Sequence, residues 1–376
     1  MAKIAILAGE PSGDLIASQL MSHINSKLKN IQFVGVGGPL MKQQGLRSFF
    51  DYSNLSLYGI FQVIPNIPKL IFLRFKLINY LKSEKPDIFI GVDAPDFNFY
   101  VEKKLKQNGI PTFHYVAPSV WAWRPNRVYK IKKTTDHIFS IFPHEKSLFE
   151  KVGIQATFVG HPLANKIPLK SNKFKYRKML KLDRKEIVIA LLPGSRKGEL
   201  KAHTDTLLET AQKLLEVHPD AKFLIPATND KNVHFIKGRI RNNPTKNLKL
   251  IKGKVDEILS SANIAIAASG TASLQIALHK KPMIIIYKGS WISYFIWKMV
   301  RLIPNVSLPN ILLNENFVPE MLQHRATPNL LSEKACKIIN DKEYSKKIES
   351  KFNKLHKNLK KNTSSLIFKI IKPYLK

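Results

Sequence analysis

The stretch IVIALLPGSRKGEL, residues 187–200, has the composition of an anion-binding turn. An apolar run ends at the sequence PGSR, and a helical pattern begins near Glu199 and continues to about Val217. A buried strand that ends in a Gly/Ser turn and opens a helix presents free backbone N–H groups beyond the strand end. Arg196 adds a guanidinium group, which can hold a phosphate through two parallel hydrogen bonds. The stretch predicts a cradle for a diphosphate, and the alternative is an ordinary strand–turn–helix connection.

A second turn of this type, ASGTA at 268–272, closes a later apolar run and opens another helix. In the first half, the apolar run 88–92 leads instead to carboxylates, Asp93 and then Asp96. An acid at the carboxyl end of a buried parallel strand lies at the functional edge of the sheet and can act as a base toward a hydroxyl group. The alternative is a helix cap with Pro95 in the first turn. We favour the base for Asp93 and the cap for Asp96.

The stretch HYVAPSVWAWR, residues 114–124, places aromatic and polar side chains together after a further strand. Ser119, Trp121 and Trp123 combine flat apolar surfaces with hydrogen-bond donors, which suits a sugar or an acyl chain. Packing of the two tryptophans in the core is the alternative. The two carboxylates above have no further acidic or histidine neighbours at metal-ligand spacing, so the sequence indicates no metal site there.

Apolar runs alternate with helical patterns throughout the chain. We expect strands at 3–8, 31–36, 87–92, 112–116, 137–141 and 157–159, and again at 187–192, 222–226, 248–251, 264–268 and 283–287. This order predicts an α/β protein with two Rossmann-like, doubly wound domains that face one another across a cleft, with ligands beyond the carboxyl ends of the strands. The expected domains are 1–168 and 183–340, and basic helices at 341–376 are expected to cross back to the first domain.

The charge of the chain is its most unusual property, because 61 basic and 27 acidic residues give a formal net charge of +34. Such a field attracts polyanions, namely nucleic acid, anionic lipid surfaces or phosphorylated substrates. No zinc-finger spacing, RNP signature or basic heptad helix indicates a nucleic-acid-binding protein. A single cysteine, Cys336, excludes an internal disulfide and fits a reducing compartment. No apolar run reaches the roughly 20 residues of a membrane-spanning helix, and the first run is too short for a secretory signal, so we expect a cytoplasmic protein.

Eight short motifs occur in order along nearly the whole chain: AGEPSGD at 8–14, GVGGP at 35–39, GVDAPDFN at 91–98, HYVAPSVWAWR at 114–124, GHP at 160–162, LLPGSR at 191–196, ASGTA at 268–272 and SLPN at 307–310. Together they resemble the lipid-A-disaccharide synthase family. The resemblance implies an inverting glycosyltransferase of the GT-B class that needs no metal and no cofactor. Such an enzyme transfers 2,3-diacylglucosamine from UDP to the 6-hydroxyl of 2,3-diacylglucosamine 1-phosphate (lipid X), forming the β-1,6-linked lipid A disaccharide 1-phosphate.

Residue by residue, the resemblance implies that Asp93 is the essential acid and Arg196 the essential arginine. Asp93 would accept the proton of the attacking hydroxyl group, and Arg196 would stabilise the departing diphosphate. The first domain would then be the acceptor side, with candidate residues Glu10, Ser12, Ser119, Trp121 and Trp123. The second would bind the UDP-sugar, with candidate residues Gly194, Ser195, Arg196, Ser269, Gly270, Thr271, Gln275 and Asn310.

Two positions depart from the family pattern. Gln275 stands where the family typically has Glu, and Asn165 stands where Asp is commoner. An amide offers one acceptor oxygen instead of two, so the affinity for the nucleotide can differ from that of the family.

Acylated substrates require a surface that meets the membrane. On a helix at 291–303, one side would carry the apolar residues Ile292, Phe295, Ile296, Met299 and Leu302. This pattern is typical of an interfacial helix, although a core-facing helix gives the same projection. The segment 57–81 is apolar on nearly every side, and its prolines limit it to a short or late helix that either docks on lipid or is buried. We expect peripheral association with the anionic inner membrane, and a homodimer through the C-terminal helices is left open.

The sequence leaves two alternatives open. One is another UDP-sugar enzyme, either a lipid-linked GlcNAc transferase or a UDP-GlcNAc epimerase. The epimerase needs no acyl-binding surface, so the apolar segments with interspersed basic residues, 57–81 and 291–303, argue against an epimerase. The other is a nucleic-acid-binding protein without enzymatic activity, which only the charge supports.

Overall fold

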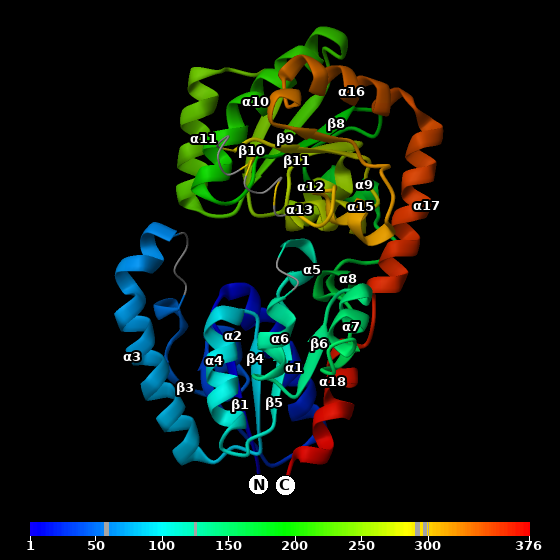
Figure 1. Ribbon diagram of the computed structural model, residues 1–376. Coiled ribbons are helices and arrows are strands. Elements are labelled where there is room, and N and C mark those ends of the chain that lie inside the picture. Colours follow the sequence, from blue (N-terminus) through cyan, green and yellow to red (C-terminus); the bar gives the residue numbers. More distant parts are fainter. Residues whose placement is uncertain (56–59, 124–125, 290–293, 296–298, 300) are drawn as a thin grey trace. The chain divides into compact units, whose positions relative to one another are not determined.

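Buried apolar runs form parallel strands in both halves of the chain (Figure 1). The computed structural model describes residues 1–55, 60–123, 126–289, 294–295, 299 and 301–376, with all side chains in these ranges except those of residues 53, 60–66, 122 and 123. The described chain divides into one unit of Met1–Pro162 with Leu359–Lys376 and a second unit of Leu163–Asn358. The division falls before the expected boundary at residue 168. Of the C-terminal helices, the last belongs to the first unit.

The first unit is built on a seven-stranded parallel sheet of order β3-β2-β1-β4-β5-β6-β7. Its strands are β1 (Ala2–Ala8), β2 (Ile31–Gly37), β3 (Leu46–Asp51), β4 (Ile88–Val92), β5 (Thr112–Tyr115), β6 (His137–Ser140) and β7 (Gln155–Phe158). Its helices are α1 (Pro11–Lys27), α2 (Pro39–Gln43), α3 (Ile60–Glu84), α4 (Pro95–Lys106), α5 (Val120–Trp123), α6 (Arg127–Lys132), α7 (Pro143–Glu150) and α18 (Thr363–Ile371), with short 3₁₀ turns at Tyr52–Asn54 and Lys372–Tyr374. Helices α3 and α4 bury one core with β1, β2 and β4, and α18 packs beside α1 (Figure 1).

The second unit is built on a six-stranded parallel sheet of order β10-β9-β8-β11-β12-β13. Its strands are β8 (Val188–Leu192), β9 (Lys222–Ala227), β10 (Leu248–Lys252), β11 (Ile264–Ala268), β12 (Met283–Tyr287) and β13 (Glu320–Leu322). Its helices are α8 (Pro162–Lys166), α9 (Lys173–Met179), α10 (Lys197–Val217), α11 (Asp230–Asn242), α12 (Val255–Ser261), α13 (Thr271–Leu278), α15 (Leu308–Leu313), α16 (Pro328–Asn340) and α17 (Lys342–Leu359), with a 3₁₀ turn at Gln323–Arg325. Both units therefore have the expected α/β architecture.

The register of the strands brings the predicted turns to one edge of each sheet. In the first unit Val92 pairs with Ala8 on β1 and with Tyr115 on β5, so the turns after these three strands leave the sheet together. In the second unit Ala267 of β11 pairs with Leu192, the last residue of β8, so the PGSR and ASGTA turns leave their sheet together. This carboxyl edge is where open α/β sheets bind ligands.

The expectation of a short or late helix at 57–81 is wrong. Helix α3 runs from Ile60 to Glu84 and passes through Pro65 and Pro68. Each proline removes one amide donor, but the second half of the helix is held by tertiary packing, since Leu77 and Leu81 are fully buried against the sheet. No helix among the described residues is both long and apolar enough to cross a membrane.

Candidate active site

A pocket of about 450 Å³ lies at the carboxyl edge of the second unit. Strands β8, β9 and β11 and the starts of α10 and α13 supply its walls. Of the eight residues assigned to the UDP-sugar side, seven line it: Gly194, Ser195, Arg196, Ser269, Gly270, Thr271 and Gln275. Two turns that lie far apart in the sequence thus form one concave site.

The turn between β8 and α10 differs from the predicted cradle of free amides. Glu199 Oε2 accepts hydrogen bonds from the backbone N–H groups of Ser195, at 2.9 Å, and of Arg196, at 3.1 Å. Gly194 has φ +107°, and a Cβ atom there would lie 2.5 Å from Glu199, so this fold of the turn requires glycine. In this structure the amides of Ser195 and Arg196 are therefore bonded to a carboxylate of the same helix and are not free donors for an anion.

The positive charge of this turn comes instead from the Arg196 side chain. It is 78% exposed, and its Nη1 lies 3.5 Å from Glu199 Oε1. An exposed ion pair of this kind is weak. The guanidinium group can therefore turn to a phosphate in the pocket at small cost.

The turn between β11 and α13 keeps its helix N-terminus open toward the pocket. Gly270, with φ +145°, is the N-cap residue, and no side chain among the described residues caps α13. Ser269 Oγ donates to the carbonyl oxygen of Val306 at 2.9 Å. The first amides and the dipole of α13 consequently favour a negative group at Thr271.

Gln275 is held by Asp256. Its Nε2 donates to Asp256 Oδ1 at 2.7 Å, and the same carboxylate contacts His279 and Lys166, both at 3.1 Å. The hydrogen bond from His279, with smaller contributions from Gln275 and Lys166, holds the pKa of Asp256 well below its usual range although burial opposes this. Since the amide nitrogen of Gln275 is turned to Asp256, its single carbonyl oxygen is the acceptor that it can offer to a ligand.

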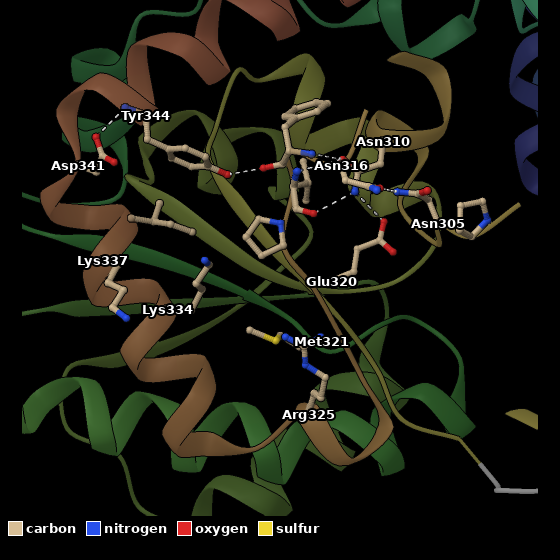
Figure 2. A pocket seen from close by; sticks show the side chains of 15 residues that line it. Asn305, Asn310, Asn316, Glu320, Met321, Arg325, Lys334, Lys337, Asp341 and Tyr344 are labelled. Atoms are coloured by element: carbon tan, nitrogen blue, oxygen red, sulfur yellow. Dashed lines mark hydrogen bonds between the residues drawn. The ribbon is translucent and has the colours of Figure 1, made fainter. Parts of the chain in front are cut away.

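Asn310, the eighth predicted nucleotide residue, does not line this pocket. It is 2% exposed, and its amide bonds to the chain: Nδ2 donates to Val318 O and to Glu320 Oε1, both at 2.9 Å, and Oδ1 accepts from Val318 N at 2.9 Å (Figure 2). The bonds of this side chain hold residues 310–320 together, and its place among the nucleotide residues stays a prediction.

Asp93 lies directly after β4 in the first unit, half-buried. Asp93 and Ala94 both have left-handed backbones, with φ +53° and +44°, which costs about 1–2 kcal/mol for each residue. The conformation is fixed from both sides, because Asp93 N donates to Tyr115 O at 2.8 Å and Asn98 Nδ2 donates to Asp93 O at 2.7 Å. Strain that the surroundings enforce is common where a catalytic group must be aimed.

Asp96 does not cap the helix, so that expectation is wrong. The N-cap residue of α4 is Ala94, which has no side-chain cap, and Asp96 is already helical. Its side chain is 88% exposed and forms an ion pair with Arg127. It lies too far into solvent for the burial that tunes a catalytic carboxylate.

A buried polar network that the sequence reasoning missed lies between α4 and β5. His114 Nδ1 and Glu102 Oε1 are 2.6 Å apart, and both side chains are fully buried. Burial raises the pKa of Glu102, and His114 opposes this shift. A Cβ atom on Gly91 would lie 2.2 Å from Glu102 Oε1, so the glycine of the GVDAPDFN motif makes room for this pair. The alternation of strands and helices gave no signal for it.

The motif AGEPSGD places three polar residues at the start of α1. Glu10 is the N-cap residue and Ser12 is exposed in the first turn. Asp14, which is not among the predicted site residues, is 2% exposed and accepts backbone hydrogen bonds from Gly38 at 2.9 Å and Met41 at 3.0 Å. It thereby ties this turn to the GVGGP turn after β2.

The aromatic motif after β5 is described in part. Ser119 is exposed, and the indole N–H of Trp121 donates to Glu145 Oε1 at 3.1 Å. Burial raises the pKa of Glu145 to about 7 although this hydrogen bond and the Phe142 amide oppose the shift. The side chain of Trp123 lies outside the described residues. Trp121 is therefore held in a fixed orientation rather than packed loosely in the core.

Comparison with known proteins decides between the enzyme classes that share this architecture. A family model described as lipid-A-disaccharide synthetase matches residues 4–371. The chain belongs to the lipid-A-disaccharide synthase family. The lipid-A-disaccharide synthase of Dechloromonas aromatica is 42% identical over 366 residues, covering 96% of each chain. That of Methylobacillus flagellatus is 37% identical over 378 residues, covering 100% of each.

Solved structures with this fold have more distant sequences. UDP-GlcNAc 2-epimerase from Neisseria meningitidis, bound to UDP-GlcNAc, aligns with a TM-score of 0.66 at 13% identity and covers 99% of this chain and 100% of its own. A glycosyltransferase from Rickettsia africae aligns with a TM-score of 0.58 at 14% identity, covering 99% and 97%. At these identities the likeness shows the GT-B fold alone. As a member of the lipid-A-disaccharide synthase family, the chain is a glycosyltransferase of lipid A biosynthesis, which confirms the resemblance.

Proposed function

We propose that this chain transfers 2,3-diacylglucosamine from UDP to the 6-hydroxyl of 2,3-diacylglucosamine 1-phosphate. The products are UDP and the β-1,6-linked disaccharide 1-phosphate. The observation that supports the proposal best is the pocket of about 450 Å³, which gathers seven predicted nucleotide residues from two separate turns. Family membership selects the acylated sugars over other UDP-sugars.

In the proposed mechanism Asp93 is the general base. Its carboxylate accepts the proton as the 6-oxygen of the acceptor forms a bond to the anomeric carbon of the donor. The bond from that carbon to the diphosphate breaks, and its electron pair leaves with UDP. Attack and departure on opposite faces invert the anomeric centre without a covalent enzyme intermediate. The backbone bonds of Asp93 to Tyr115 and Asn98 support this role, because they fix the backbone from which its side chain projects.

The second unit would stabilise the negative charge that builds on the departing diphosphate. The open N-terminus of α13 and the exposed guanidinium group of Arg196 supply positive charge at the pocket. Glu199 holds the turn that carries Arg196. This division of roles needs no metal ion in the reaction.

A product assay tests the proposal. The purified protein is given both acylated substrates, and UDP release is measured beside the mass of the product. We expect one UDP for each disaccharide 1-phosphate and no release without the acceptor. Conversion of unacylated UDP-GlcNAc to an epimer, with no requirement for an acceptor, would instead support the epimerase alternative. Activity should be nearly insensitive to salt when the substrates are kept in detergent micelles, since no polyanion is needed.

We also propose that the enzyme binds peripherally to anionic membrane surfaces from the cytoplasmic side. Four large apolar side chains of α3 are exposed: Ile67, Ile71, Phe72 and Phe75. In the second unit Phe295, Met299 and Leu302 are exposed, whereas Ile292 and Ile296 lie outside the described residues. Exposed apolar groups on a chain of net charge +34 suit an interface between acyl chains and anionic headgroups.

Serine substitution of either exposed pair, Phe295 with Met299 or Phe72 with Phe75, should release protein from anionic vesicles. Each large apolar side chain that enters lipid contributes about 1.5–3 kcal/mol, so a pair changes the partition coefficient by about 100-fold or more. The melting temperature should stay within a few degrees of wild type, because these side chains are exposed in the fold. Vesicle flotation and calorimetry measure the two quantities.

The matched control is the pair Phe174 and Met179, which are also large, apolar and exposed but belong to α9. Their serine variants should keep wild-type vesicle binding. A Phe295/Met299 variant that unfolds, with no vesicle binding by wild type even at low salt, would show that this segment is part of the core.

A further inference from the structure

The carboxylate of Glu320 accepts four hydrogen bonds from residues 306–310, the end of a loop together with the first turn of α15. Glu320 Oε1 accepts from Ser307 N at 3.0 Å and from Ser307 Oγ at 2.7 Å. It also accepts from Asn310 Nδ2 at 2.9 Å (Figure 2). Its Oε2 accepts from Val306 N at 3.0 Å. A carboxylate is acceptor-only and has room for about four donors, so this side chain is saturated by residues 306–310.

The carboxylate is anchored at the sheet. Glu320 is the first residue of β13, and it pairs in register with Ile285 of β12. Asn310 adds bonds to the segment just before this strand, with Nδ2 donating to Val318 O and Oδ1 accepting from Phe317 N at 3.2 Å and Val318 N at 2.9 Å. The loop at 306–310 is thus fixed to the edge of the sheet by buried, charge-assisted bonds.

The same loop reaches the predicted nucleotide turn at two points. Ser269 Oγ donates to Val306 O at 2.9 Å, and Leu308 N donates to Ser273 Oγ at 3.1 Å. Ser273 Oγ in turn donates to Gly270 O at 2.7 Å. Both ends of the ASGTA turn are therefore tied to the loop that Glu320 holds.

Buried hydrogen bonds fix this segment, in which Ser307 and Asn310 are almost fully buried. A cavity of about 570 Å³ lies on the other side of Glu320 and Asn310, toward Arg325 and Lys334 (Figure 2). A buried donor that loses its acceptor is costly to keep in place, and the cavity offers space into which the segment can shift. The position of the ASGTA turn consequently depends on the Glu320 carboxylate.

We propose that Glu320 is a positioning residue of the nucleotide site, and that Asn310 acts with it rather than by touching the nucleotide. Through Val306, Ser307 and Leu308 it sets the positions of Ser269 and of the N-terminus of α13. This inference rests on the proposed function, which assigns the pocket to UDP. It also explains how a buried, fully bonded asparagine can matter for a site that it does not line.

The test is Glu320→Gln. Glutamine keeps the size but has one acceptor oxygen, so in either orientation its NH₂ group faces at least one donor of the loop. We expect the Kd for UDP, measured by titration calorimetry on folded protein, to rise about tenfold or more. The KM for the UDP-sugar should rise with it. The kcat should fall as well, because the N-terminus of α13 that Glu320 positions is also assigned to the charge on the departing diphosphate.

The matched control is Glu315→Gln, in the same loop region. Glu315 forms an exposed ion pair with Lys351 and has no part in the bonds above, so its variant should bind UDP as wild type does. Ser307→Ala removes one donor and keeps the carboxylate, and it should raise the Kd in the same direction by a smaller factor. Ser307→Ala also tests the inference if the Glu320→Gln variant does not fold.

The outcomes separate this inference from the proposed function. If wild type does not bind UDP, the assignment of the pocket is wrong. If wild type binds UDP and folded Glu320→Gln binds it equally well, Glu320 has only a structural role and the inference is overturned. A fall in melting temperature alone, with Kd unchanged, leads to the same conclusion. An unchanged Kd in Ser307→Ala overturns the inference when Glu320→Gln is unfolded.

Discussion

Asp93→Asn is expected to lower kcat by about 10²–10⁴-fold, the usual cost of losing a general base. Asparagine keeps the size of the side chain and the backbone bonds to Tyr115 and Asn98, so the strained turn should persist. Only the proton acceptor is lost. The Kd for UDP should therefore stay within about twofold of wild type, because the nucleotide pocket is built from the other unit. Single-turnover kinetics with saturating donor measure the effect directly.

The chain offers a matched control for this substitution in Asp96. It carries the same side chain in the next turn, but it is 88% exposed and paired with Arg127. Asp96→Asn removes a surface ion pair, which contributes little, and should leave kcat within about threefold. The opposite result, near wild-type turnover for Asp93→Asn and a large loss for Asp96→Asn, would move the base to Asp96.

The strands could be predicted from the sequence where both faces are buried. Runs such as Ile264–Ala268 and Met283–Tyr287 are continuously apolar, so their bounds were found without error. The two strands that were missed are edge strands. β3 alternates buried and exposed residues, and β13 has three residues, so neither forms an apolar run. Each is defined by its pairing with one neighbouring strand, β2 or β12, and this pairing has no local signal.

The candidate site was predictable where function depends on glycine turns and strand ends. The PGSR and ASGTA turns line one pocket because parallel strands bring their carboxyl ends to one edge. The buried or half-buried carboxylates that accept hydrogen bonds from backbone amides were not predictable. Asp14, Glu199 and Glu320 each bind backbone amides, and a sequence does not show which amides will lie within reach. Glu199 affects the expected chemistry most, since it accepts hydrogen bonds from two amides of the PGSR turn.

Arg196→Ala is expected to lower kcat by about 10²–10³-fold, the typical cost of removing a group that stabilises charge in the transition state. The Kd for UDP should also rise, by about tenfold or more, because a charge-assisted bond to the diphosphate is lost in the ground state as well. The carboxylate of Glu199 should enlarge both the fall in kcat and the rise in the Kd for UDP. Its Oε1 lies 3.5 Å from the guanidinium group, and without that partner a carboxylate is left unpaired beside the diphosphate. Steady-state kinetics and calorimetry separate the two effects.

The structure also predicts how far lysine can replace Arg196. Lysine restores the charge that offsets Glu199 but not the two parallel donors of the guanidinium group, so Arg196→Lys should recover the Kd for UDP more fully than kcat. Lys201→Ala is the control for charge alone. It removes one cation from the exposed face of the same helix, outside the pocket, and should change both quantities by less than about twofold. Comparable losses in Lys201→Ala and Arg196→Ala would mean that the net field of the chain binds the nucleotide. Wild-type kinetics in Arg196→Ala would leave the α13 N-terminus as the source of positive charge at this pocket.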